Sequence, residues 1–470
     1  MRRNSVLYLL IFGWMLMAVP REIQAQEGVD PLVLTFGEYI HEVIHHHPLS
    51  AKARLNRQKA EANLRAARGG FDPVLSAGMD QKQYQDKMYY RKEKAELRIP
   101  TVAGIEVVGG YENNQGYYLN PENQTGDNGL WNAGIEVNIL QGLLVDERRT
   151  ALRQAKTYAQ LAEQQQILQT NELYYEAAKV YLYWANSHKN LEVVEESTQL
   201  AQQYFLNTKE SYINGEKTAM DTLEAFTMWQ DRQNLLVAAE GNLIAQKANL
   251  ENYFWQKEEV ILEPQYQPQA EIDYHTVPIQ AAAIPADFSA NPQLLASQYE
   301  IETLETGRLL KQQKLWPKLK LKYMPLLSPT GDGLPTYNQN DYKWGFGFQL
   351  PLFLRAGRGD LLLSQIKIQE KQLDLETKTL VLENKIINSK AQISYLEDQV
   401  NNQRQNVSSY QKLLEGEIEK FNYGESSVFL VNKRQEKYLE GQIKLTELRT
   451  KVEVEKLSYL YYINQLPIPE

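Results

Sequence analysis

The chain has 470 residues, of which 43% are hydrophobic and 23% are charged, and its formal net charge is −9. This acidic balance argues against nucleic acid as a partner. The sequence holds no cysteine, which excludes disulfides, thiolate metal ligands and a lipid-modified cysteine.

The first residues read as a secretory signal peptide. Arg2 and Arg3 precede an apolar run from Val6 to Val19, and small residues follow near Ala25. An apolar run this short favours a cleaved signal peptide at residues 1–25 over a retained membrane anchor. No later apolar stretch reaches the length of a transmembrane helix, so we expect any membrane crossing to be made by β-strands.

An internal repeat organises the rest of the chain. Three landmarks occur twice in the same order, at separations of 244, 211 and 209 residues: His47-Pro48 with Asn291-Pro292, the segment 131–137 with 342–348, and 212–216 with 421–425. We interpret the chain as a tandem duplication, with a first repeat at 26–254, a second at 291–470, and a proline-bearing linker at 255–290.

Each repeat contains a very long predicted helix. The 72 residues between Gly142 and Gly215 include neither glycine nor proline, which predicts a helix roughly 100 Å long. The second repeat predicts a similar helix from Asp360 to Tyr423, interrupted at Gly416. Helices of this length must be covered by other helices, and their apolar residues recur at three- and four-residue spacing. We expect each to end at a glycine and return as an antiparallel hairpin, with tips at Gly215 and Gly424.

Between the helices, the sequence alternates as β-strands do. Trp344, Phe346, Phe348 and Leu350 alternate with small or polar residues, and similar patterns occur at 132–139 and 318–323. A soluble sheet with one wet face would show the same period, but the signal peptide and the 29 tyrosines favour strands in a membrane. Two or four strands cannot close a barrel, so we expect several subunits to share one. The first repeat has 33 additional residues here (244 − 211), either an extra hairpin or a long external loop.

Several motifs resemble the TolC-type outer-membrane efflux family (outer membrane factors). The segment Leu34-Thr35-Phe36 and the pair His47-Pro48 resemble the start and end of that family's opening helix, and Asn291-Pro292 repeats the second. The resemblance implies an α+β fold, with tandem long helical hairpins forming a coiled-coil α-barrel and transmembrane strands contributed to a shared trimeric β-barrel. It also implies a passive exit duct in the outer membrane with a periplasmic tunnel, serving tripartite efflux or type I secretion. The partners implied are two further copies, a periplasmic adaptor (membrane fusion protein), an inner-membrane transporter and outer-membrane lipid.

The same resemblance assigns roles to the hairpin tips. It implies that the tip motifs contact the adaptor, through Tyr212, Gly215, Glu216, Phe421, Gly424 and Glu425. It implies a gate just beyond the tip glycines, with Asp221, Val428, Phe429 and Leu430 as candidates. Asp221 matches an acidic position of the family, but it would equally cap the start of its own helix.

Two other hypotheses come from the sequence. The segment His41-Glu42-Val43-Ile44-His45 matches the zinc-protease pattern H-E-x-x-H. Pro48 ends that helix almost at once, so we expect weak, adventitious metal binding rather than catalysis, and we predict no enzyme, no cofactor and no metal site. The alternative function is a non-conducting periplasmic coiled-coil structural or adaptor protein. Such a protein needs only one helical hairpin, so the duplication favours the channel; the cargo cannot be read from the sequence.

Overall fold

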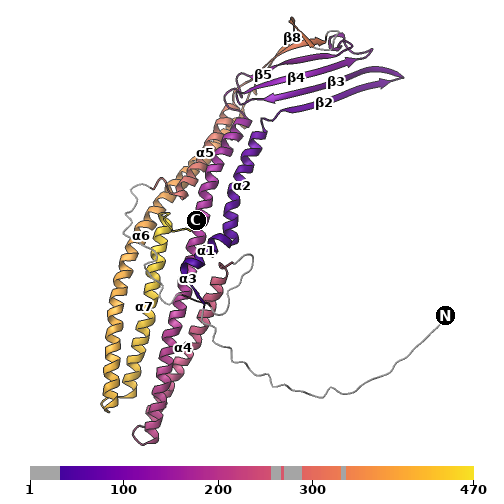
Figure 1. The fold of residues 1–470 in the computed structure, drawn as a ribbon. Helices are drawn as coiled ribbons and strands as arrows, with labels where there is room; N and C mark the ends of the chain where they lie inside the picture. Colours follow the sequence, from indigo (N-terminus) through magenta and orange to yellow (C-terminus); the bar gives the residue numbers. More distant parts are fainter. Residues whose placement is uncertain (1–31, 256–265, 269–287, 330–334, 470) are drawn as a thin grey trace, which may run out of the picture.

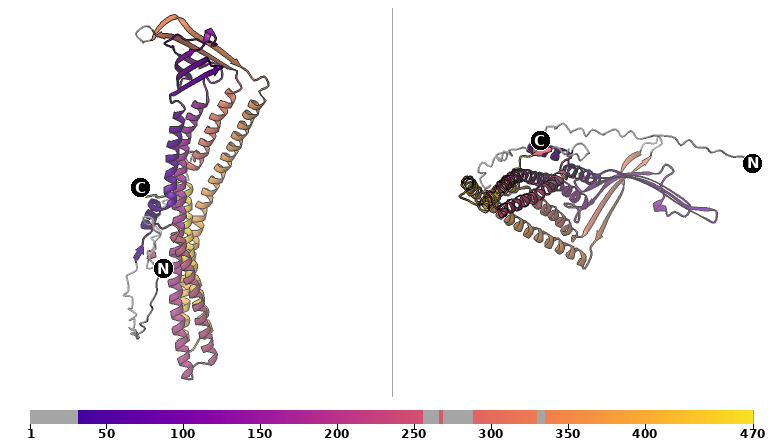
Figure 2. Two further views of the ribbon diagram at one scale, coloured as in Figure 1. Left: turned by 90° about the vertical axis from the view of Figure 1, so that its right-hand side faces the viewer. Right: turned by 90° about the horizontal axis from the view of Figure 1, so that it is seen from below.

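The computed structural model describes residues 32–255, 266–268, 288–329 and 335–469, and it shows a long rod of helices with a sheet at one end (Figure 1). Two helical hairpins form the far part of the rod, and their tips point away from the sheet (Figure 2). The signal peptide predicted at 1–25 and most of the linker predicted at 255–290 lie outside the described residues. Both remain predictions.

The first repeat contributes α1 (Phe36–His46), α2 (Pro48–Gly69), α3 (Glu147–Ile213) and α4 (Ala219–Glu251). The second contributes α5 (Pro292–Gln313), α6 (Arg355–Asn422) and α7 (Val428–Tyr462). The long helices α3 and α6 have 67 and 68 residues, close to the predicted length. None of the described helices carries an apolar stretch long enough to cross a membrane.

The second long helix differs from its prediction at two points. It begins at Arg355 rather than Asp360, so Gly357 and Gly359 lie within its first turns. Gly416 lies inside the helix and does not interrupt it. One glycine costs a helix only about 1 kcal/mol, and packing of α6 along α7 outweighs that cost.

The helices are ordered side by side as α2, α3, α5 and α6, and α4 and α7 pack on α3 and α6 as the returning arms of the hairpins. The largest core cluster lies around the middle of α3, where α1 and the ends of α4 and α7 meet it. It is dominated by buried aromatic side chains: Tyr39, Tyr174, Tyr181, Trp184, Phe254 and Tyr459. These rings fix the two hairpins to each other because large aromatic groups bury the most area per residue.

One antiparallel sheet of six strands caps the rod, in the order β2-β3-β4-β5-β7-β8. Its strands are β2 (Val74–Tyr84), β3 (Lys87–Pro100), β4 (Ile105–Gln115), β5 (Leu130–Asn138), β7 (Lys318–Pro329) and β8 (Pro335–Gln349). The additional residues of the first repeat therefore form an extra hairpin, β3–β4, paired within the sheet on both sides. A separate parallel pair joins β1 (Leu32–Leu34) to β6 (Tyr266–Pro268).

Candidate functional site

The two hairpin tips share one turn geometry. Gly215 and Gly424 have φ angles of +80° and +75°, a region that glycine enters without strain. The glycine N–H donates to the carbonyl three residues back, and the next N–H donates to the carbonyl five residues back, at Ser211 and Lys420. This pair of bonds ends a helix tightly, so both long helices stop where the sequence predicted their tips.

The first tip is exposed, and it carries apolar side chains. Tyr212, Ile213, Met220 and Leu223 all face solvent in the single chain, and Glu216 lies beside them in the turn. A cluster of exposed apolar groups on an otherwise polar helix end is typical of a contact surface. The first-tip residues predicted to contact an adaptor, Tyr212, Gly215 and Glu216, are therefore accessible.

Asp221 caps its own helix. Its Oδ2 accepts hydrogen bonds from the Thr218 N–H (2.9 Å) and hydroxyl (2.7 Å), while its own N–H donates to the Thr218 hydroxyl. These bonds hold the pKa of Asp221 below its usual value, and the bond from the Thr218 hydroxyl has the largest effect. The structure thus gives Asp221 the capping role that the sequence left open, and the carboxylate is largely occupied within its own chain.

The second tip has the same plan with different side chains. Ser427 caps α7 by accepting from the Leu430 N–H, so Leu430 occupies the position of Asp221. Phe429 and Leu430 are exposed, but Val428 is completely buried against its own hairpin. Of the apolar gate candidates, only Phe429 and Leu430 are therefore free to meet another subunit.

The two tips touch each other through Phe421, a residue of the predicted site, and two residues that the predicted site did not contain. The Lys217 ammonium lies 4.0 Å from the centre of the Phe421 ring, and the Tyr204 ring lies 5.4 Å from it. Burial, followed by the negative charges of Asp221 and Glu224, raises the pKa of Tyr204. Phe421 thus couples α6 to the first hairpin; no local pattern signals this contact because its partners are more than 200 residues away.

The sheet has one apolar face that runs across its strands. Cross-strand pairing places Ile99, Val107, Ile135, Tyr323 and Trp344 in one row. A second row contains Ile105, Val137, Leu321 and Phe346. Leu75, Trp344 and Phe346 are 63–73% exposed in the single chain. A continuous exposed apolar face of this kind needs an apolar environment.

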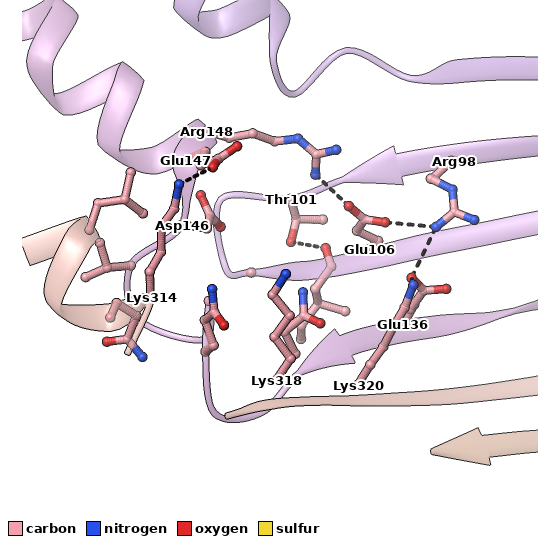
Figure 3. A pocket seen from close by; sticks show the side chains of 18 residues that line it. Arg98, Thr101, Glu106, Glu136, Asp146, Glu147, Arg148, Lys314, Lys318 and Lys320 are labelled. Atoms are coloured by element: carbon pink, nitrogen blue, oxygen red, sulfur yellow. Dashed lines mark hydrogen bonds and ion pairs between the residues drawn. The ribbon is translucent and has the colours of Figure 1, made fainter. Parts of the chain in front are cut away.

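The opposite face of the sheet is polar and held by ion pairs (Figure 3). Arg98 binds Glu96 (2.7 Å), Glu106 (3.0 Å) and Glu136 (3.2 Å), which lie on β3, β4 and β5. Arg148 at the start of α3 also binds Glu106 (2.6 Å), and Lys320 on β7 binds Glu136. The network ties the extra hairpin to β5, β7 and α3, so the hairpin is part of the sheet rather than a loose loop.

The H-E-x-x-H segment lies on α1. His41 and His45 stack with ring centres 4.0 Å apart, and the His45 Nδ1 is 2.8 Å from the His41 carbonyl oxygen. His46 lies 3.6 Å from the Glu42 carboxylate, and His47 caps the next helix. Within the described residues, no three His, Cys, Asp or Glu side chains are grouped closely enough to hold a metal ion.

Two long helical hairpins joined at one end to an amphipathic sheet define the fold of this chain. The chain matches no protein-family model and no curated protein sequence. Its fold is similar to that of VceC, an outer membrane protein of Vibrio cholerae, with 16% identity and a TM-score of 0.64 over 91% of this chain and 95% of VceC.

Two further solved structures show the same fold. The outer-membrane channel OprN has 10% identity and a TM-score of 0.67 over 92% of this chain and 90% of its own. The outer membrane channel CmeC of Campylobacter jejuni has 12% identity and a TM-score of 0.64 over 92% and 86%. The resemblance to TolC-type proteins is thus confirmed for the fold, and two of these solved structures, OprN and CmeC, are outer-membrane channels.

Proposed function

We propose that three copies of this chain form a channel in the outer membrane with a tunnel through the periplasm. It would be the exit duct of a tripartite efflux or type I secretion system, with passive transport through it. The two-faced sheet carries this proposal. Its apolar face suits contact with lipid, and its polar, charged face suits a water-filled lumen.

The edges of the sheet require partners. Among the described strands, β2 and β8 each pair on one side only, and unpaired backbone groups are not tolerated in lipid. The edge strand β2 continues α2, and the edge strand β8 leads into α6 at the other side. The same side-to-side contact between copies therefore joins both sheets and helices, and repeating it closes a ring. Six strands per copy keep neighbouring strands antiparallel across each joint.

An exposed stripe on α6 supports the same assembly. Ile366, Leu373, Leu380 and Ile387 follow one another at intervals of seven residues, and all are exposed in the single chain. Seven-residue apolar spacing is the pattern by which helices pack along one another. Because α6 is the outermost helix of its layer, the helix that covers this stripe belongs to another copy.

The tips would dock the rest of the machine. Their exposed apolar groups lie at the end of the rod remote from the sheet (Figure 1). A sheet in the outer membrane would hold these groups deep in the periplasm, where an adaptor (membrane fusion protein) and an inner-membrane transporter are reached. Tyr212, Glu216 and Glu425 are exposed for that contact, and Phe429 and Leu430 would narrow the entrance.

Membrane fractionation followed by cross-linking tests this function. We expect the protein in outer membranes after a salt wash, cross-linking as a trimer and conducting ions in planar bilayers. The double substitution L373D/L380D should reduce the trimer fraction. Q372D, an exposed change on the same helix about 100° around it from Leu373, should not. Release by the salt wash, or a trimer without conductance, would favour the alternative of a periplasmic structural protein.

A further inference from the structure

The polar face of the sheet carries a row of lysines on β7. Lys318, Lys320 and Lys322 alternate with apolar residues, so all three side chains lie on that face. Their neighbours on β8 are Gln349, Gly347 and Gly345. Among the described residues, no atom outside the immediate chain neighbours lies within 4 Å of where a side chain at either glycine would begin. Lys320 and Lys322 therefore stand beside open space.

The carboxylates near this row are already neutralised. Glu136 is bound by Arg98 and Lys320, and Glu106 is bound by Arg98 and Arg148. Closer to the helices, Glu147 is bound by Lys314 (2.7 Å) and Asp146 by Arg149 (2.9 Å). The bond from Lys314 is the main cause that lowers the pKa of Glu147. Each negative group of the network thus has at least one cationic partner.

Two of these lysines have no ion-pair partner among the described residues. Within the described residues, neither Lys318 nor Lys322 makes an ion pair, although Lys318 lies near enough to Glu147 to help lower its pKa. Lys318 lines a cavity of about 580 Å³ at the base of the sheet, together with Lys314 and Lys320 (Figure 3). Lys343 on β8 lies on the same face, one row beyond Gly345. The excess charge of this region is positive.

We propose that Lys318 and Lys322 form an anion-binding band in the lumen of the channel, so that the duct favours multivalent anionic solutes. The inference rests on the proposed function, because the polar face must line the lumen and three copies must bring six of these ammonium groups around one axis. Rings of unpaired cationic side chains attract anions into a pore. The uncovered position of Gly345 on β8 leaves room for a phosphate-sized group beside Lys322, and the cavity lined by Lys318 leaves room beside that lysine.

Block of single channels by tripolyphosphate tests the band. The probe is added at the sheet side of channels in phosphatidylcholine bilayers. This lipid has no net charge, so tripolyphosphate is the only multivalent anion present. Wild type should be blocked. K318Q and K322Q each remove three ammonium groups per trimer, so each should weaken the block at least about fivefold, the effect of a single unit charge at close range in water. K87Q is the matched control because Lys87 is the first residue of β3, beside the β2–β3 turn at the far end of the sheet. It should leave the block unchanged.

The outcomes separate this inference from the proposed function. Conducting channels that tripolyphosphate does not block would overturn the anion band alone. So would a K87Q substitution that weakens the block as much as K318Q does. Channels that conduct but bind the probe only from the tip side would do the same. Absence of any conductance would overturn the duct and the band together.

Discussion

His47 offers a test of how the helices within each repeat are fastened together. Its Nδ1 accepts from the Leu49 N–H (3.1 Å) at the start of α2, and its Nε2 lies 3.2 Å from the Asn252 carbonyl oxygen at the end of α4. Asn291 does the same in the second repeat: its side chain accepts from the Gln293 N–H and donates to the Tyr462 carbonyl. Each residue thus ties the start of one helix to the end of another.

The magnitude of a change at His47 follows from these contacts. H47A removes the helix cap, about 1 kcal/mol, and the bond to Asn252, about 1 kcal/mol. It also removes the ring stacked on Tyr253 at 5.7 Å, which adds about 0.5–1 kcal/mol. H47N copies the residue of the other repeat and keeps both hydrogen bonds, so it should lose only the ring contact.

The pH dependence has a definite sign. Burial lowers the pKa of His47 below its usual 6.5, and the bond to the Asn252 carbonyl offsets part of this shift. Protonation would place a hydrogen on Nδ1 facing the Leu49 N–H, with the rings of Tyr253 and Trp255 beside it. The unfolded chain then binds a proton more readily than the folded one, so the stabilisation is complete above about pH 6.5 and is lost as pH falls below it.

Thermal unfolding of the purified protein at pH 8, 7, 6 and 5 measures this effect. Wild type should unfold at a higher temperature than H47N at pH 8, and the gap should shrink or reverse by pH 5. The other histidines titrate in both proteins and cancel in the difference. A gap that stays constant with pH, or H47A as stable as H47N, would refute the capping role.

Three further predictions concern the tips and the sheet edges. G215V and G424V force a β-branched residue to positive φ, at a cost of roughly 1–2 kcal/mol, and should stop export without reducing the trimer in membranes; full export by both would exclude the tips as the docking surface. D221A should alter cation selectivity in bilayer recordings while the resting conductance stays low, because the Asp221 carboxylate is hydrogen-bonded to Thr218. F429S should raise the resting conductance. A large rise with D221A would show that ionic links hold the gate. Cysteine pairs placed across β8 and β2 should cross-link copies in a chain without native cysteine; cross-links between β8 and β4 instead would mean that β2 and β3 lie outside the wall.

The sequence by itself determined the features that depend on local backbone preferences. A stretch without glycine or proline specified the first long helix, and a stretch containing Gly416 alone specified most of the second. Gly215 and Gly424 specified the turns because few other residues adopt positive φ. Period-two alternation located β5, β7 and β8. The duplication was visible because both repeats keep the same local signals in the same order.

Tertiary structure decided what depends on contacts between distant residues. The same alternation fits a hairpin inside a sheet or outside it, so only the pairing of β3 and β4 with β2 and β5 settled their place. The ion network around Glu136 joins Arg98 and Lys320, which come from opposite repeats. Tertiary structure also decided the exposure of adjacent residues in one apolar run. Val428 is buried and Phe429 is exposed, because packing against the hairpin, not hydrophobicity, selects which side chain faces inward.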